Sequence, residues 1–494
     1  MGVIKRQGTK NTLTSFLGIA IGFVNLMIIQ PQFLTKEELG LTRILYSFSI
    51  LVAMFVPMGI GNATIRFFPL FKNTEKKHYG YFGFMVLFPL LGYLLAAVLI
   101  WTFKDFVAGQ WRRESPLFTE YFNFVFPLIF FNAFIAVLTS YCSINYKTTI
   151  PAFLNDVVVR ILTIALVSVY FLKWLTFYQF TACFVGIYGL QLAILMGYIL
   201  QFDKISFRFD WAEFRERKIF ELIRYGLLLW FASVASIGIK YFDSIMLGKF
   251  MPLEFVAVYA IAAFIPTVIE APLTAFEKIA ASKIAFAWAD NDHDQIKQIY
   301  HKSSLYLFIV GGFLFLMVNT NTHTLLGLLP SGYQAGEIVV FIISLQTIFN
   351  MATGLNAPIL FNSERYRYGA VFLISLAVLI LFLQYFLIPV WGMTGAAIAT
   401  ASASVIYNLM LFFAVWKYYG LQPFDDSNLK VLFSIAVCYA IQWMMPHYEN
   451  FILDFIVRSC VVGIPYLLLI KYFQVGNELF EQVPMIRDFF RRKR

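Results

Sequence analysis

The sequence predicts an all-α integral membrane protein with about 14 transmembrane helices, arranged as two pseudo-symmetric six-helix lobes plus two C-terminal helices. Composition, a series of long apolar runs and an internal repeat support this prediction. Hydrophobic residues make up 60% of the 494 residues and charged residues only 13%, with a mean hydropathy of +0.73. Soluble domains are about one quarter charged. The composition therefore excludes a water-soluble globular protein.

The apolar runs are long enough for helices, which need about 20 residues to cross about 30 Å of hydrocarbon. They are too long and too uniformly apolar for transmembrane strands, which alternate in polarity over about ten residues. The first run directly follows a basic segment and has no cleavage motif, so it is predicted to be an uncleaved span. The expected spans are 12–34, 41–68, 80–103, 119–142, 150–172, 176–201, 219–248, 253–285, 303–320, 333–360, 368–388, 393–416, 429–446 and 451–473.

An internal repeat predicts the domain organisation. Residues 33–66 align with residues 250–283, and this alignment pairs Arg66 with Lys283. Such repeats are typical of transporters with two lobes of equal orientation. The expected parts are an N-terminal lobe at 1–201, a cytoplasmic amphipathic linker at 202–218, a C-terminal lobe at 219–417, two further spans at 428–473 and a basic cytoplasmic tail at 474–494.

The distribution of Lys and Arg predicts the orientation. These residues are concentrated in alternate loops, on the same side as the two termini, which predicts that both termini are cytoplasmic. The net charge of +10 arises from these scattered short loops. Because no basic domain with interleaved aromatic residues occurs, we expect no nucleic-acid partner.

Residue types that carry enzymatic or cofactor chemistry do not form motifs. The four cysteines lie singly in apolar runs without CxxC spacing, and the five histidines map to loops or span ends. No P-loop sequence occurs. The sequence therefore predicts no catalytic residue, metal or cofactor. A glycan ligase or acyltransferase stays open as an alternative, although the outer loops offer only Asp105, Glu114 and His447 without a clustered set.

Cations inside the predicted spans are candidates for binding substrate, because a charge in hydrocarbon is costly unless it faces a cavity or a partner. The predicted substrate-binding residues are Arg66, Arg160, Lys240 and Lys283. Arg66 and Lys283 occupy matching places at the inner ends of two spans. Arg160 and Lys240 are expected near mid-membrane, one from each lobe. Snorkelling to lipid phosphates stays open for Arg66 and Lys283.

Neighbouring acids leave structural roles open for the other cations. Lys240 and Asp243 are one helical turn apart and can form an ion pair, and Asp156 lies one turn before Arg160. Arg458, in the last span, is interpreted as a lipid or interface contact.

Three acids are candidates for coupling transport to a proton or sodium ion. They are Asp243, Glu270 and Glu277. Glu270 and Glu277 are seven residues apart on one helix face, near Pro266 and Pro272. Prolines in a span free backbone carbonyls and bend the helix, which suits a moving gate but also occurs in static helices.

Four segments carry a family resemblance. They are GTKNTLTSFLGIAIGFVNLMIIQPQFLTKEELG at 8–40, GIGNATIRFFP at 59–69, KYFDSIMLGKFMPLEFVAVYAIA at 240–262 and WGMTGAAIATASASVIYN at 391–408. The chain resembles the polysaccharide-transporter and lipid-flippase branch of the multidrug/oligosaccharidyl-lipid/polysaccharide exporter superfamily. The resemblance implies a two-lobed transporter that moves undecaprenyl-diphosphate-linked sugars across the bacterial cytoplasmic (inner) membrane. It also implies membrane lipids, and a polysaccharide polymerase or export machinery, as partners.

The charges favour this substrate over a cationic drug. A diphosphate carries about two negative charges that cannot cross hydrocarbon alone, so unpaired Arg and Lys would replace its water. The first span contains no Asp or Glu between Thr12 and Leu34. In the drug-exporting branch of the family that this chain resembles, the first span typically carries an acid. A cation-coupled multidrug exporter, with Asp243 or Glu270 binding the ion, stays open as the alternative.

Overall fold

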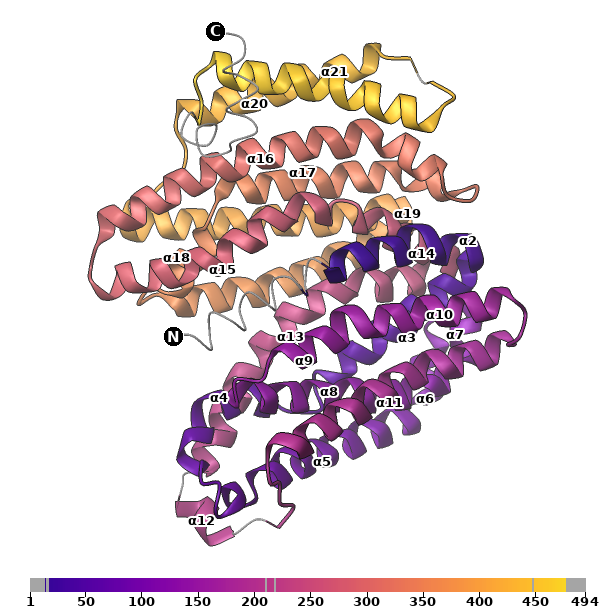
Figure 1. Ribbon diagram of the computed structural model, residues 1–494, viewed down its shortest axis with the longest axis vertical. Helices are drawn as coiled ribbons and strands as arrows, with labels where there is room; N and C mark the ends of the chain where they lie inside the picture. Colours follow the sequence, from indigo (N-terminus) through magenta and orange to yellow (C-terminus); the bar gives the residue numbers. More distant parts are fainter. Residues whose placement is uncertain (1–13, 15–16, 209–210, 217–218, 447, 477–494) are drawn as a thin grey trace. The chain divides into compact units, whose positions relative to one another are not determined.

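The computed structural model describes residues 14, 17–208, 211–216, 219–446 and 448–476 (Figure 1). Within these residues all regular secondary structure is helical. The basic N-terminal segment, His447 and residues 477–494 of the predicted tail lie outside the described residues. The predicted fold class, an all-α membrane protein, is confirmed.

Eight described helices are long and apolar enough to cross a membrane. A ninth span is obtained if the helices Leu253–Phe264 and Thr267–Ala289, bent by 51°, are taken together. The span count of about 14 stays a prediction.

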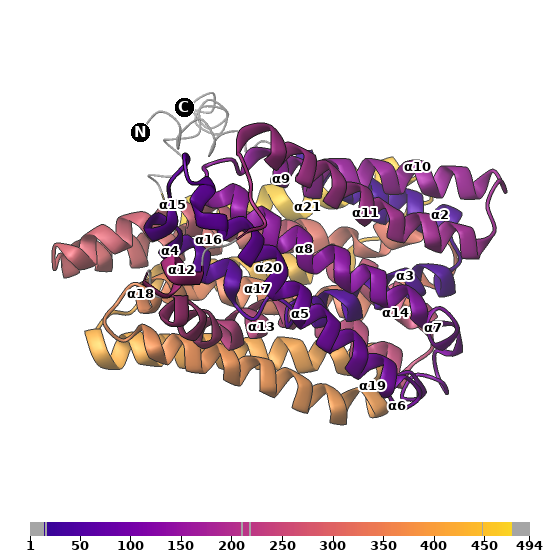
Figure 2. The same cartoon turned by 90° about the horizontal axis from the view of Figure 1, so that it is seen from below.

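Contacts between Cα atoms divide the chain into two compact units, Met1–Ala257 and Val258–Arg494. The first unit contains η1 (Val24–Ile29), α2 (Gln30–Phe33), α3 (Lys36–Ala53), α4 (Ile60–Phe71), η2 (Lys77–Gly80), α5 (Tyr81–Thr102), α6 (Lys104–Gly109), α7 (Pro116–Glu120), η3 (Phe122–Phe124), α8 (Val125–Ile144), α9 (Thr149–Phe153), η4 (Leu154–Val158), α10 (Val159–Phe171), α11 (Phe177–Phe202), α12 (Trp211–Glu216) and α13 (Ile219–Phe250). Helix α8 packs against both α5 and α11 (Figures 1 and 2).

Two helices of the first unit begin with complete capping boxes. The Thr35 hydroxyl accepts from the Glu38 backbone N–H at the start of α3, and Thr176 does the same for Gln179 at the start of α11. In both helices, the side chain of the third residue accepts a hydrogen bond from the backbone N–H of the capping threonine. These caps satisfy backbone donors that a helix end otherwise leaves unpaired, and they fix where both spans begin.

The second predicted span is a broken helix. Helix α3 ends at Ala53 and α4 begins at Ile60. Between them Pro57 lacks an N–H, and Gly59 adopts a φ of 77°. A Cβ atom at Gly59 would collide with the backbone carbonyl of Gly226, so glycine allows α4 to cross α13 closely. The break therefore lies where α13 packs on span two.

The segment that joins α11 to α13 is anchored on the first unit. Phe214 of α12 is fully buried, with its ring against Phe71, Tyr81 and Phe84. The Gly83 N–H donates to the carbonyl of Ser206 at 3.1 Å. Helix α13 follows and packs on α3 and α4. For this reason the unit boundary lies after α13, and the repeat-based lobe boundary at 219 stays a prediction.

The second unit contains the remaining helices. Helix α16 packs against α15, α17, α20 and α21. Helix α19 is two helices joined at Gly392, whose φ is 55°, and this kink separates the predicted spans 368–388 and 393–416. The elements are α14 (Leu253–Phe264), which crosses the unit boundary, α15 (Thr267–Ala289), α16 (His293–Gly327), η5 (Tyr333–Gly336), α17 (Glu337–Thr353), α18 (Asn356–Phe361), α19 (Tyr366–Tyr419), α20 (Asp426–Ile441), η6 (Gln442–Met444) and α21 (Phe451–Tyr472).

Candidate substrate site

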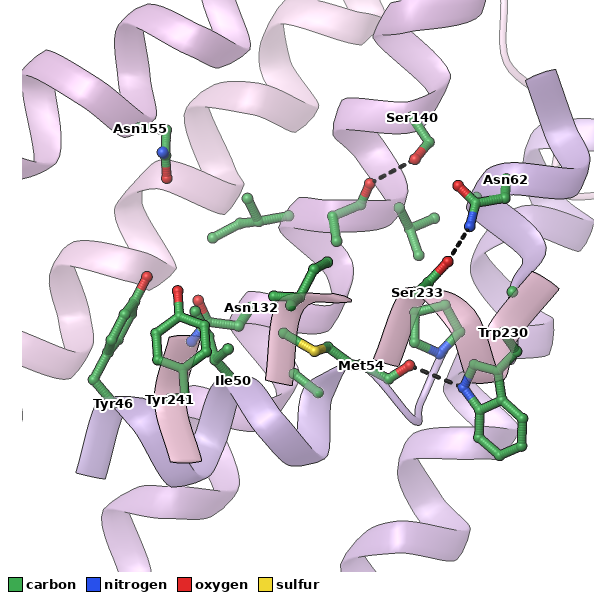
Figure 3. Close-up of a pocket in the computed structure, with 18 residues that line it drawn as sticks. Tyr46, Ile50, Met54, Asn62, Asn132, Ser140, Asn155, Trp230, Ser233 and Tyr241 are labelled. Atoms are coloured by element: carbon green, nitrogen blue, oxygen red, sulfur yellow. Dashed lines mark hydrogen bonds between the residues drawn. The ribbon is translucent and has the colours of Figure 1, made fainter. Parts of the chain in front are cut away.

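A cavity of about 400 Å³ lies inside the first unit (Figure 3). Ten of its 18 lining residues are apolar, and we call it the polar cavity after the other eight. Its walls come from α3, the break after α3, α4, α8, η4 and α13. None of the 18 lining residues carries a charge. The polar lining residues are Tyr46, Asn62, Asn132, Ser140, Asn155, Trp230, Ser233 and Tyr241.

Hydrogen bonds across the broken span hold one end of this cavity. The Asn62 amide donates to the Ser233 hydroxyl at 2.6 Å, joining α4 to α13. The Trp230 indole N–H donates to the Met54 carbonyl at 3.1 Å, where α3 has just ended. Figure 3 shows both bonds side by side. The break thus exposes a backbone carbonyl that α13 then satisfies.

The opposite end of the cavity has an aromatic wall and two amides. Tyr46 stacks on Tyr188 with 5.3 Å between ring centroids and meets Tyr241 edge-on at 6.1 Å. Asn132 donates to the Leu128 carbonyl of its own helix at 2.8 Å. Asn155 is the second amide at this end (Figure 3).

Arg66 lies on α4 one helical turn after Asn62. Its exposed guanidinium lies over the Tyr225 ring of α13, with 4.6 Å from Cζ to the ring centroid. The structure therefore places this predicted site cation on the α4–α13 pair that also walls the polar cavity.

Lys283 lines a separate cavity of about 300 Å³ in the second unit. The cavity lies between α15 and α16, and Lys302, Gln295 and Gln298 also line it. No sequence pattern marks Lys302 as a candidate for binding substrate. Its place on the next helix, close to Lys283, depends on the packing of α15 on α16.

Arg160 contacts the first span. Its guanidinium donates a hydrogen bond to the Gly18 carbonyl, and a side chain at Gly22 would occupy the place of the guanidinium. Asp156 accepts from the Asn155 amide at 3.0 Å. Arg160 is not among the residues that line the polar cavity, whereas its neighbour Asn155 is.

Lys240 is exposed on α13, next to the cavity residue Tyr241. Lys240 and Arg160 fall in the same compact unit, whereas the repeat predicts one from each lobe.

Glu270 and Glu277 lie on α15, beyond the 51° bend. Glu270 is exposed and Glu277 half-buried. Their coupling role, like that of Asp243, stays a prediction.

Arg458 differs from its expected lipid or interface contact. Its side chain is buried in the second unit and forms an ion pair with Asp454 at 2.8 Å. Arg458 also donates to the Pro446 carbonyl, and Asp454 accepts from Thr324 of α16. The four-residue spacing of Asp454 and Arg458 on one helix face makes this pair possible.

An apolar cavity of about 770 Å³ lies in the second unit between α16, α17, α19 and α20. Its only polar lining residues are Gln346, Ser402 and Asn428. This cavity has fewer polar lining residues than the polar cavity of the first unit.

Residues 31–328 match the model of a family described as polysaccharide biosynthesis proteins. An uncharacterised membrane protein of Methanocaldococcus jannaschii is 24% identical over 97% of both chains.

Two solved structures have a similar fold. The lipid II flippase MurJ, in an inward closed conformation, matches 94% of this chain and 98% of its own, with 15% identity and a TM-score of 0.73. An inward-facing multidrug resistance MATE family transporter of the MOP superfamily matches 83% and 94%, with 14% identity and a TM-score of 0.58. The superfamily fold expected from the resemblance is therefore confirmed.

Proposed function

The chain belongs to the polysaccharide biosynthesis protein family. From this premise we propose that it is a transporter of the multidrug/oligosaccharidyl-lipid/polysaccharide exporter superfamily and that it flips undecaprenyl-diphosphate-linked oligosaccharide. The glycan moves from the inner to the outer leaflet of the bacterial cytoplasmic membrane by alternating access. The product serves capsule, exopolysaccharide or O-antigen (lipopolysaccharide) synthesis. The similarity to a lipid II flippase supports this class of substrate.

The observation that carries the proposal is a cation beside an uncharged polar cavity. Arg66 follows the cavity residue Asn62 by one turn on α4, and the 18 lining residues hold no charge. This arrangement matches a lipid-linked glycan. Its anionic diphosphate would face the cation, and the polar sugars attached to the diphosphate would face the uncharged cavity. Arginine binds phosphate oxygens through charge-assisted hydrogen bonds.

The second unit offers groups for the other parts of such a substrate. Lys283 and Lys302 line one cavity and would favour a phosphate group. The apolar cavity of about 770 Å³ suits an isoprenoid chain, which gains free energy by leaving water. Arg160 and Lys240 are proposed as further substrate-binding cations.

The alternative is a cation-coupled multidrug exporter, whose solved relative shares the fold. A site for a cationic drug needs an acid, and the polar cavity has none. Asp243, Glu270 and Glu277 are proposed instead to couple transport to a proton or sodium ion. A polysaccharide polymerase or export machinery is the proposed partner.

Proteoliposomes that contain fluorescent undecaprenyl-diphosphate oligosaccharide test the function. An impermeant quencher reaches only the probe in the outer leaflet. We expect the purified protein to bring probe from the inner leaflet to the outer leaflet, so that the fluorescence left after the first quenching step falls faster than in protein-free liposomes. The double variant Arg66→Gln/Lys283→Gln should abolish this gain. Arg365→Gln is the matched control, because Arg365 also lies over a tyrosine ring, that of Tyr418, at 4.0 Å. Transport of a cationic dye without glycan movement would instead support the drug exporter.

A further inference from the structure

We infer that the polar cavity of the first unit is a subsite for neutral sugar rings, which selects glycans whose rings there carry no carboxylate. This inference rests on the proposed function and deepens it. It concerns the cavity lined by Tyr46, Asn132, Asn155 and Tyr241, and not the cations that would hold the diphosphate.

The absence of charge in the lining is the first argument. A cavity walled by 18 residues without Asp, Glu, Lys or Arg offers no counter-ion to a uronic or sialic carboxylate. Moving an unpaired carboxylate out of water costs far more free energy than one hydrogen bond returns. Moving a hydroxyl group out of water costs much less free energy, and hydrogen bonds to amide side chains can offset that cost. The lining therefore discriminates against acidic sugars.

The free hydrogen-bonding capacity of the two amides is the second argument. The Asn132 amide donates one N–H to the Leu128 carbonyl, and the Asn155 amide donates one N–H to the Asp156 carboxylate. Among the described residues, neither amide oxygen has a hydrogen-bond partner, and both side chains line the cavity (Figure 3). An amide offers two acceptor lone pairs and two donors. Sugar hydroxyls both donate and accept, so they match this pair of amides.

The aromatic wall is the third argument. Tyr46 and Tyr241 present ring surfaces in the same cavity, at 73° to each other. Tyrosine combines an apolar ring with a polar tip, which suits the apolar C–H face and the polar edge of a sugar ring. The volume of about 400 Å³ lies within the range of about 300–1,000 Å³ that small-molecule sites occupy.

The binding test uses free sugars and needs no transport. Saturation-transfer-difference NMR on the purified protein is recorded with maltotriose as the neutral probe and with trigalacturonate as the acidic probe. We expect signal from maltotriose and at least tenfold less from trigalacturonate. Asn132→Ala should lower maltotriose affinity about tenfold, because a sugar hydroxyl then loses its partner inside the cavity.

Asn319→Ala is the matched control for this variant. Asn319 donates to the carbonyl four residues before it at 2.9 Å, as Asn132 does, but it lies on α16 and does not line the polar cavity. Its maltotriose affinity should stay within twofold of wild type. Equal binding of both probes, or equal loss in both variants, would overturn the subsite.

A transport experiment tests the sugar subsite independently of the proposed flippase function. Two undecaprenyl-diphosphate glycans, one neutral and one with uronic acids, are compared in the proteoliposome assay. Preference for the neutral glycan, lost in Asn132→Ala, supports the subsite. Equal flipping of both glycans overturns the subsite and leaves the flippase intact. If neither glycan moves, the proposed function fails, and the maltotriose result alone decides on the cavity.

Discussion

The guanidinium of Arg160 on α10 donates a hydrogen bond to the backbone carbonyl of Gly18 in the first span. Gly18 and Gly22 face span five, and side chains at these positions would collide with Asp156 and Arg160. The pair of glycines four residues apart allows the two spans to approach closely, as small residues do at membrane helix interfaces. Arg160 thus joins spans one and five, which gives it a packing role beside its proposed role in binding.

Arg160→Lys separates these two roles. Lysine keeps the charge but cannot reproduce the guanidinium geometry. If Arg160 mainly joins the spans, we expect a loss of about 1.5–3 kcal/mol of stability, the value of a hydrogen bond to a charged group. Thermal unfolding in detergent measures it, with Arg224→Lys, an exposed cation on α13, as control. Unchanged melting with weaker glycan transport would assign Arg160 to the substrate.

Exchange of Lys240 and Asp243 tests whether the Lys240 cation serves the substrate. The variant Lys240→Asp/Asp243→Lys keeps both charges but moves the cation by one turn of α13, about 5 Å. Because Lys240 is exposed next to a cavity residue, we expect transport of lipid-linked glycan to fall at least tenfold while melting temperature is kept. Transport at the wild-type rate would show that the pair is structural and that the assignment of Lys240 is wrong.

Lys283 and Lys302 are expected to act together, because both line the cavity between α15 and α16. Each charge-assisted contact to phosphate is worth about 1.5–3 kcal/mol. Lys283→Gln alone should weaken binding of a soluble isoprenyl diphosphate about tenfold, and Lys283→Gln/Lys302→Gln about a hundredfold. Isothermal titration measures both. Lys278→Gln, an exposed lysine of α15 that does not line this cavity, should leave affinity unchanged. No loss in the double variant would favour snorkelling.

The predicted orientation places the segment after α11 in the cytoplasm. Lys204 is exposed there, and Lys204→Cys provides a labelling site. Because Cys183 and Cys460 are also exposed, the background carries serine at both. We expect an impermeant maleimide to label the new cysteine in inside-out vesicles but not in intact cells. Labelling of intact cells would reverse the topology.

The sequence predicted the helical membrane fold well, because hydrocarbon imposes long apolar helices on any chain that crosses it. Helix starts were also marked locally, as Thr35 and Thr176 show through their capping boxes. Pro57 and Gly59 are a local signal for the break in span two, but they lie within a continuous apolar run that predicts one unbroken span. The consequence of the break, a cavity against α13, could not be inferred from local pattern.

The candidate site was harder to predict, because its uncharged polar residues carry no signal in a single sequence. Asn132 and Asn155 are ordinary residues until α8 and η4 bring them to one cavity. Lys302 was missed for a related reason, since its neighbour Lys283 lies on another helix. Arg458, by contrast, had a visible partner in Asp454 at a spacing of four residues.

The Asp454–Arg458 pair predicts a large stability effect in the second unit. Both side chains are almost fully buried, at 2% and 3% exposure, and they connect α21 to Thr324 of α16. Removal of one partner leaves an uncompensated buried charge, which costs about 3–5 kcal/mol. We therefore expect Arg458→Met to lower the melting temperature strongly. The double variant Asp454→Leu/Arg458→Met should melt closer to wild type, because no charge is left buried. Lys430→Met, an exposed cation of α20, is the control. A double variant no more stable than Arg458→Met would contradict this account and assign the loss to packing alone.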